Sequence, residues 1–161
     1  SVALRYFNPI GSHSSALIGD CSADRPSNLV PIITEVAIGK REKITVFGDN
    51  YNTPDGTCIR DYIHVVDLAK SHVKAMDFLI KNPGKHAFNV GTGIGVSVLD
   101  AIKAFEKTNN LNISYSIGPR RNGDIEKIYA NGSLVKAKLG WEAEETLDQA
   151  MKSAWEWEKQ K

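Results

Sequence analysis

Several classes of protein are excluded by what this sequence has little of. It contains two cysteines, Cys21 and Cys58, in no metal or redox spacing, and we interpret them as free thiols of a cytoplasmic protein, with a disulfide as the alternative. No apolar run approaches the length of a transmembrane helix, and we expect no signal segment in this protein. The net charge is +1, from 20 basic and 19 acidic residues, which lacks the basic excess of a general nucleic-acid or acidic-membrane binder.

A dinucleotide fingerprint is also missing, although residues 91–95 (Gly-Thr-Gly-Ile-Gly) come close to one. The fingerprint needs one more glycine at position 96, where this sequence has Val96. It also needs an acidic residue about 20 positions further on, and residues 113–115 have none. Glycines that allow a turn with positive φ between a strand and a helix explain the pattern, and we favour this structural interpretation over a cofactor loop.

No catalytic group is predicted within these 161 residues. None of the five tyrosines has a lysine four positions later, the spacing of the pair that supplies the general base in a class of reductases. The histidines form no metal-ligand cluster, and no nucleophile elbow is present. His64 and His72 flank Asp67, so a triad or a metal site can be drawn there, but packed or surface-linked histidines are the simpler interpretation.

What the sequence does contain predicts an α/β fold. With 42% hydrophobic and 24% charged residues, the composition is that of a globular chain with one domain-sized core. Strand and helix signals alternate along the chain, which is typical of α/β proteins. We expect strands at residues 2–7, 44–47, 57–66, 86–90, 112–117 and 125–130, and helices that start at residues 27, 67, 97 and 146, with a short one that reaches residue 139.

The helix ends are predicted from their capping residues. Asp67, Ser97 and Thr146 are the expected N-caps, because their side-chain oxygens can accept hydrogen bonds from the first free backbone amides. The helix that follows Asp67 is expected to bury one apolar face, formed by Leu68, His72, Ala75, Met76, Leu79 and Ile80.

Arginine stands close to aspartate in two segments of the chain. Arg60 directly precedes Asp61, and Arg121 is three residues before Asp124, with a sharp turn between them. Guanidinium groups bind a diphosphate through forked hydrogen bonds, and a carboxylate accepts hydrogen bonds from ribose hydroxyls, so this mixture suits a nucleotide sugar. From the chemistry alone, solvated ion pairs that contribute little are an equally open interpretation.

The same segments carry a resemblance to one family, the UDP-glucose 4-epimerases of the extended short-chain dehydrogenase/reductase class. The match runs from Leu4 to Trp157, and its most specific parts are residues 8–13, 28–29, 51–69, 88–91, 119–124 and 139–141. Related sugar-nucleotide dehydratases and decarboxylases share the general layout, whereas the string from 55 to 69 is similar to the 4-epimerases in particular. Ser27, where the family commonly has asparagine, departs from the pattern.

The resemblance implies a domain organisation. Residues 1–161 would be the single C-terminal, UDP-sugar-binding domain of such an enzyme. Residues 1–10 and 86–91 would be strands that complete the Rossmann-like sheet of an NAD-binding domain outside this sequence. Neither methionine, Met76 or Met151, stands first, so we expect the chain to begin inside a longer protein.

The resemblance also implies site residues, none of them catalytic. They would be Phe7 against the nicotinamide end of NAD; Asn8, Asn28 and Leu29 for the hexose and diphosphate; Thr45, Val46 and Phe47 for uracil; Arg60 and Arg121 for the diphosphate; Asp124 for the ribose; and Ile128 for the wall of the hexose pocket. Ile128 matches a position whose bulk limits the hexose pocket in the family. Because isoleucine is smaller than tyrosine, the resemblance predicts some tolerance for N-acetylated sugars.

The implied activity is that of an isomerase of galactose metabolism, which interconverts UDP-glucose and UDP-galactose with NAD as a cytoplasmic homodimer. The hexose would be oxidised at C4, rotate as a 4-keto sugar and be reduced on its other face, while tightly held UDP leaves the sugar free to turn. The chain alone is expected to be inactive. Two alternatives stay open: a non-catalytic nucleotide-sugar-binding module, and an epimerase of other UDP sugars such as UDP-N-acetylglucosamine.

Overall fold

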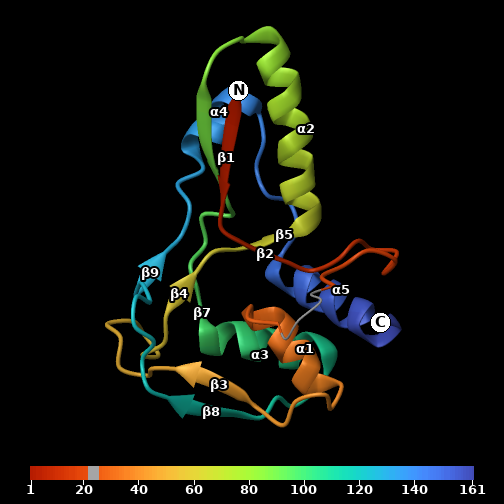
Figure 1. Cartoon of the computed structure of the whole chain (residues 1–161), viewed down its shortest axis with the longest axis vertical. Coiled ribbons are helices and arrows are strands. Elements are labelled where there is room, and N and C mark those ends of the chain that lie inside the picture. Colours follow the sequence, from red (N-terminus) through yellow and green to blue (C-terminus); the bar gives the residue numbers. More distant parts are fainter. Residues whose placement is uncertain (22–25) are drawn as a thin grey trace.

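The computed structural model describes residues 1–21 and 26–161, which form an α/β fold of five helices and nine strands (Figure 1). This confirms the predicted fold class. The helices are α1 (Leu29–Ala37), α2 (Val65–Lys81), α3 (Val98–Asn109), α4 (Ser133–Leu139) and α5 (Leu147–Gln160). The strands are β1 (Val2–Tyr6), β2 (Asn8–Ile10), β3 (Ile44–Phe47), β4 (Ile59–Arg60), β5 (Tyr62–His64), β6 (His86–Val90), β7 (Val96–Ser97), β8 (Tyr115–Gly118) and β9 (Lys127–Ile128).

The strands form several small sheets rather than one large one. Three parallel pairs, β1–β6, β2–β5 and β3–β8, each join strands far apart in the sequence. In the three-stranded sheet, β4 lies between β7, to which it is antiparallel, and β9, to which it is parallel. Figure 1 shows β1, β6, α2 and α4 at the end of the molecule that holds the N-terminus, and α1, α3, β3 and β8 at the other end.

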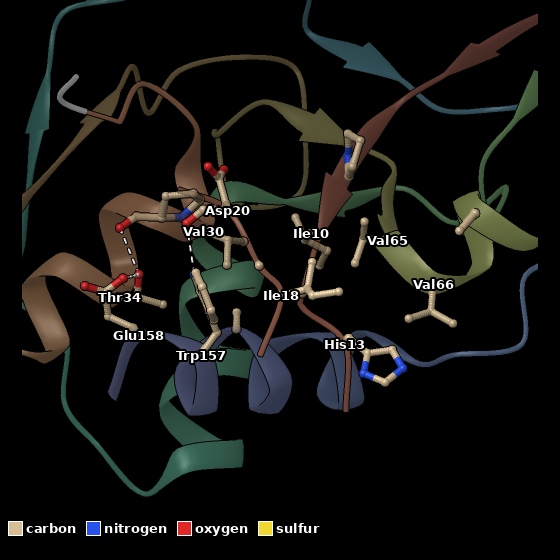
Figure 2. Close-up of a pocket in the computed structure, with 16 residues that line it drawn as sticks. Ile10, His13, Ile18, Asp20, Val30, Thr34, Val65, Val66, Trp157 and Glu158 are labelled. Atoms are coloured by element: carbon tan, nitrogen blue, oxygen red, sulfur yellow. Dashed lines mark hydrogen bonds between the residues drawn. The ribbon is translucent and has the colours of Figure 1, made fainter. Parts of the chain in front are cut away.

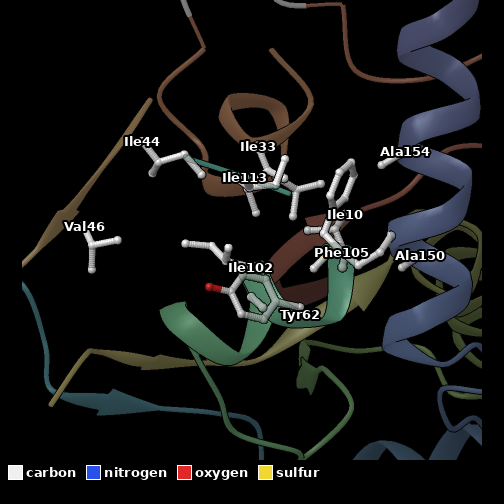
Figure 3. Close-up of a cluster of buried hydrophobic side chains, with 13 residues drawn as sticks. Ile10, Ile33, Ile44, Val46, Tyr62, Ile102, Phe105, Ile113, Ala150 and Ala154 are labelled. Carbon is white, nitrogen blue, oxygen red and sulfur yellow. The ribbon is translucent and has the colours of Figure 1, made fainter. Parts of the chain in front are cut away.

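Each end has its own hydrophobic core. The core around α1, α3, α5 and β3 centres on Ile33 and Phe105, which are fully enclosed (Figure 3). Met151 belongs to the same core and is equally enclosed. The second core packs α2 and α4 against β1 and β6 and includes Phe88 and Val90. Burial of these apolar side chains supplies the main driving force for folding at each end.

Two of the predicted helix caps are confirmed. The Ser97 hydroxyl accepts a hydrogen bond from the Asp100 amide at 3.0 Å, and Thr146 forms a reciprocal capping box with Gln149. The prediction for Asp67 is wrong, because α2 begins at Val65 and its N-cap is His64. Of the predicted strand 57–66, only β4 and β5 are strands, separated at residue 61, and Val65 and Val66 belong to α2.

The exposed side of α2 also differs from the prediction. Of the predicted buried face, Met76 and Ile80 are 66% and 77% exposed and His72 is exposed as well. Val73 is exposed beside them, whereas the polar Ser71 is buried. The apolar pattern of this helix is wide enough to cover two faces, and only one of them packs against β1 and α4. Among the described residues, no helix has the length and apolar character to cross a membrane.

Candidate functional site

Nine of the eleven residues assigned from the resemblance line one pocket of about 150 Å³. The pocket lies where the start of α1, strands β3 and β4 and the loop after β8 meet. These nine residues are Asn8, Asn28, Leu29, Thr45, Val46, Phe47, Arg60, Arg121 and Asp124. They come from five separate stretches of the chain, so the fold brings together residues that the sequence keeps far apart.

The other two residues lie outside the lining. The Phe7 amide donates a hydrogen bond to the Val90 carbonyl at 3.3 Å, next to the carboxyl ends of β1 and β6. Ile128 is in β9, where it is half-exposed and stands opposite Arg60 in the parallel register. Neither residue lines the pocket that contains the two arginines.

Six further residues of the lining were not assigned from the sequence: Ser27, Ile32, Ile44, Cys58, Tyr62 and Val98. Tyr62 is buried, and this burial raises the pKa of its phenol. Its position two residues after Arg60 was the available signal, because alternate residues of an extended segment lie on the same side.

Arg60 is held firmly by backbone carbonyls. One guanidinium nitrogen donates to the carbonyl of Ile59 at 2.9 Å and to that of Ile125 at 2.5 Å. A second nitrogen lies 3.7 Å from an Asp124 carboxylate oxygen, and the side chain is 18% exposed. This arginine is therefore a fixed positive charge in the wall of the pocket.

Arg121 is held by partners of a different kind. Its Nε and Nη2 atoms donate to the two carboxylate oxygens of Asp124 at 3.0 and 3.1 Å, and this pairing raises the pKa of the guanidinium. The turn between them has Gly123 at φ +86°, as the sequence predicted for this segment. The guanidinium also lies 4.7 Å from the centre of the Phe47 ring.

The neighbouring Arg120 points elsewhere. Its guanidinium lies 4.0 Å from the centre of the Tyr51 ring, and its Nε donates to the Asn50 side-chain oxygen at 2.6 Å. Arg120 is not part of the pocket lining. The two adjacent arginines thus diverge, and Arg120 is a natural control for Arg121.

The start of α1 faces the same pocket. Asn28 is the N-cap, has an extended backbone and makes no capping hydrogen bond with its side chain. Free backbone amides and the helix dipole at such an end favour an anion. Together with Arg60 and Arg121, they make this pocket suitable for a diphosphate.

The glycine-rich residues 91–95 already hold an anion, the carboxylate of Asp61. Asp61 is fully buried and accepts hydrogen bonds from the Thr92 and Gly93 amides at 2.9 Å each, from the Thr92 hydroxyl at 2.7 Å and from the Ala130 amide at 3.0 Å. A Cβ at Gly91 would lie 2.5 Å from an Asp61 carboxylate oxygen, and Gly93 has φ +76°. The positive φ that the structural interpretation expected is therefore found at Gly93, whereas Gly91 is required by its close approach to Asp61.

A larger cavity of about 480 Å³ lies between α1, α5 and the loop that follows β2 (Figure 2). Apolar side chains such as Ile18, Val30 and Trp157 form much of its wall, and Glu158 lies at one end. Its described lining residues include no lysine or arginine. This cavity therefore does not suit a diphosphate.

His64 has a structural role in the described part of the chain. Its Nδ1 accepts a hydrogen bond from the Val66 amide at 3.1 Å, so its proton is on Nε2, which lies 3.2 Å from the Ser153 hydroxyl. Burial lowers the pKa of His64. Because Nε2 donates to Ser153, the imidazole cannot take a proton from this hydroxyl in the geometry observed.

Comparisons with known proteins define the family. Residues 2–154 match the model of the family described as GDP-mannose 4,6 dehydratase, and the chain belongs to this family. Among curated proteins, it is 52% identical to a UDP-glucose 4-epimerase of Haemophilus influenzae over 97% of this chain and 46% of that protein. It is 48% identical to a UDP-glucose 4-epimerase of Drosophila melanogaster over 99% of this chain and 46% of that protein.

Solved structures agree with these relatives. A UDP-glucose 4-epimerase from Stenotrophomonas maltophila, with bound NAD and formylated UDP-arabinopyranose, superposes with a TM-score of 0.97 at 46% identity over 99% of this chain and 47% of that one. The UDP-glucose 4-epimerase from Bifidobacterium longum, in complex with NAD⁺ and UDP, superposes with a TM-score of 0.95 at 49% identity. This match covers 99% of this chain and 47% of that one. The resemblance to the C-terminal part of these epimerases is confirmed. The chain spans about half the length of the relatives it matches.

Proposed function

We propose that this chain is the UDP-sugar-binding half of a UDP-glucose 4-epimerase, an isomerase. The observation that carries the proposal is the convergence of Arg60, Arg121, Asp124 and Phe47 on one pocket at the start of α1. Two guanidinium groups and a helix end suit the diphosphate, the carboxylate suits ribose hydroxyls, and the ring suits uracil. Relatives of known structure hold UDP or a UDP sugar, which supports the same ligand class here.

In this proposal the chain anchors UDP and leaves the hexose mobile. Backbone groups of Thr45 and Val46 hold uracil, and Asn8, Asn28 and Leu29 contact the diphosphate and the sugar. Bound NAD would supply hydride chemistry at hexose C4, first on one face of the sugar and then on the other. The chain's contribution is to hold the uridine and diphosphate firmly enough that the hexose can rotate between these two positions.

The cofactor depends mainly on residues outside this sequence. Asp61 already fills the glycine-rich loop, so residues 91–95 do not fit a dinucleotide. Phe7, at the end of β1, is the residue of this chain that we assign to the nicotinamide end of NAD. No proton or hydride transfer is assigned to a side chain of the described residues.

The domain organisation is proposed on similar grounds. Strands β1 and β6 are parallel, and each has one neighbouring strand among the described residues. Next to them, α2 exposes Val73, Met76 and Ile80. An NAD-binding domain that continues the sheet at residues 1–10 and 86–91 would pair the open strand edge and cover this apolar side.

Finer features of the assembly rest on the resemblance. We propose a cytoplasmic homodimer that interconverts UDP-glucose and UDP-galactose in galactose metabolism. The half-exposed Ile128 leads us to propose some tolerance for N-acetylated sugars. Turnover of UDP-N-acetylglucosamine by an enzyme that contains this chain and an NAD-binding half tests the last point, and no turnover beside good UDP-glucose activity would rule it out.

A non-catalytic nucleotide-sugar-binding module is the second candidate. One observation favours it: the residues proposed to hold UDP all belong to this chain. Binding of UDP by the isolated chain fits both candidates, whereas epimerisation with NAD supports only the first.

Titration of UDP by calorimetry, with Arg121→Ala and Arg120→Ala side by side, tests the binding site. Loss of a charge-assisted diphosphate contact is expected to cost about 1.5–3 kcal/mol in Arg121→Ala. Arg120→Ala, which removes an arginine outside the lining, should bind UDP nearly as the unaltered chain does. Equal losses in both variants, or no binding by the folded unaltered chain, would contradict the proposed site.

A further inference from the structure

Arg121 is engaged by two groups that the nucleotide itself would need. Its guanidinium donates to both carboxylate oxygens of Asp124, at 3.0 and 3.1 Å, and lies 4.7 Å from the centre of the Phe47 ring. In the proposed function, Asp124 accepts from ribose and Phe47 stacks on uracil. In this form the guanidinium of Arg121, proposed to bind the diphosphate, therefore occupies the two groups proposed to bind the nucleoside.

The pocket has less free space in this form than pockets for small ligands usually have. Its volume is about 150 Å³, whereas pockets for small ligands usually measure about 300–1,000 Å³. The two arginines differ in their freedom to move. Arg60 is 18% exposed and is held by two backbone carbonyls, while Arg121 is 54% exposed and is held by side chains alone. Arg121 is thus the part of the wall that can swing away.

We propose that Asp124 is an internal competitor that holds Arg121 until a nucleoside diphosphate replaces it. This inference rests on the proposed function of the pocket. A diphosphate takes Arg121, and the carboxylate that is released accepts from the ribose hydroxyls. The same movement uncovers the ring of Phe47. A bare diphosphate can replace Asp124 at Arg121, but it brings no ribose hydroxyls for the released carboxylate and no base for Phe47. The pocket therefore selects diphosphates that carry a nucleoside.

The charges of the site explain this selection. Arg60 and Arg121 supply two positive charges, and Asp124 lies between them, 3.7 Å from an Arg60 nitrogen. A free diphosphate must break the paired hydrogen bonds between Arg121 and Asp124 and then lie near a carboxylate that keeps only its longer contact with Arg60, and this carboxylate repels it. With a nucleoside attached, ribose hydroxyls donate to this carboxylate, so no partly buried charge is left without a partner.

The test compares inorganic pyrophosphate with UDP in the unaltered chain and in Asp124→Asn. Removing the carboxylate charge frees Arg121, so pyrophosphate should bind at least about threefold more tightly, a factor typical of one partly screened charge. UDP should bind at least about threefold more weakly, because the ribose loses a charged acceptor. Opposite shifts for the two ligands are the expected signature. Asp124→Ser, which also removes the charge, should shift pyrophosphate in the same direction.

Two controls separate this effect from simpler ones. Glu142→Gln removes another exposed carboxylate, paired with Lys136 at 2.5 Å, and should leave both affinities unchanged. Arg121→Ala should weaken both ligands about tenfold or more. The inference is overturned if both Asp124 variants leave the pyrophosphate affinity unchanged or lower it, or if Glu142→Gln raises it equally.

The experiment also distinguishes failure of the inference from failure of the proposed function. UDP binding that Arg121→Ala removes, together with unshifted pyrophosphate binding in the Asp124 variants, overturns only the competition. Absence of UDP binding in the unaltered chain and in every variant overturns the nucleotide site and, with it, this inference.

Discussion

Asp61 and Asp124 each lie close to an arginine in the sequence, yet the fold uses their carboxylates differently. Asp61 is fully buried and binds three backbone amides and one hydroxyl. Asp124 binds the side chains of Arg60 and Arg121, and Arg121 is half-exposed. Backbone amides cannot leave without unfolding, whereas an exposed arginine side chain can. The comparison separates a carboxylate that maintains the fold from one that is free to exchange partners.

Asp61→Asn should give the largest effect. An asparagine amide would bring N–H groups against the backbone amides that now donate to Asp61, so we expect a loss of about 3–4 kcal/mol in the free energy of unfolding. Asp124→Asn should lose less, about 1 kcal/mol, because its main partner Arg121 is half-exposed and an asparagine oxygen can still accept from it. Urea denaturation of both variants measures the difference, and similar losses would end the comparison.

Gly91→Ala probes the same loop without changing charge. The new Cβ would lie 2.5 Å from an Asp61 oxygen and 2.7 Å from the Ala130 Cβ, so we expect a loss of about 2–3 kcal/mol. Gly123→Ala is the matched change beside Asp124, because its Cβ meets no atom within 4 Å but its φ is +86°. Backbone strain there should cost about 1 kcal/mol. A larger loss at Gly123 than at Gly91 would contradict our account of the loop.

Acid should reduce the contribution of a third carboxylate, that of Asp55, to the free energy of unfolding. Burial alone would raise its pKa, but hydrogen bonds from Ser97 and Thr57 outweigh this and lower the pKa below its usual value. A lowered folded-state pKa stabilises the protein above about pH 4, and this stability is lost as the pH falls further. Asp55→Asn should therefore be less stable than the unaltered chain by about 1 kcal/mol at pH 7 and by less near pH 3. A constant difference across this range, measured by urea denaturation, would exclude the linkage.

The two cysteines give the smallest effect, on reactivity rather than stability. Cys21 is exposed, whereas Cys58 is 5% exposed and lines the pocket, so a thiol reagent should label Cys58 at least about tenfold more slowly. UDP should slow labelling of Cys58 further and leave Cys21 unchanged. Mass spectrometry of the labelled peptides measures both rates, and protection of Cys21 by UDP would argue against local occupancy of the pocket.

Local patterns predicted the elements that depend on local contacts. Strands β3 and β6 and the caps at Ser97 and Thr146 were predicted at the residues where the structure has them. Asp67 was misassigned because its carboxylate accepts from the amides of Glu144 and Glu145, far away in the sequence. A local sequence pattern cannot predict a partner that lies so far away in the sequence.

The pocket shows the same limit. Its arginines, its aspartate and Phe47 were found through a resemblance, and the pairing of Arg121 with Asp124 followed from the short turn between them. Arg60 reaches Asp124 only through the pairing of β4 with β9, a long-range contact that composition and periodicity do not reveal. Tyr62 was missed for a different reason, because the local signal two residues after Arg60 was not used, and Cys58 was not recognised as part of the lining either.

The open edge of the β1–β6 pair and the exposed Val73, Met76 and Ile80 on α2 have a practical consequence for studies of this chain. Apolar sides and free strand edges associate, and association follows mass action. The midpoint of thermal unfolding should then rise with protein concentration. A melting temperature measured at one concentration would then include a contribution from self-association as well as the stability of the fold. A dilution series should therefore accompany every comparison of variants.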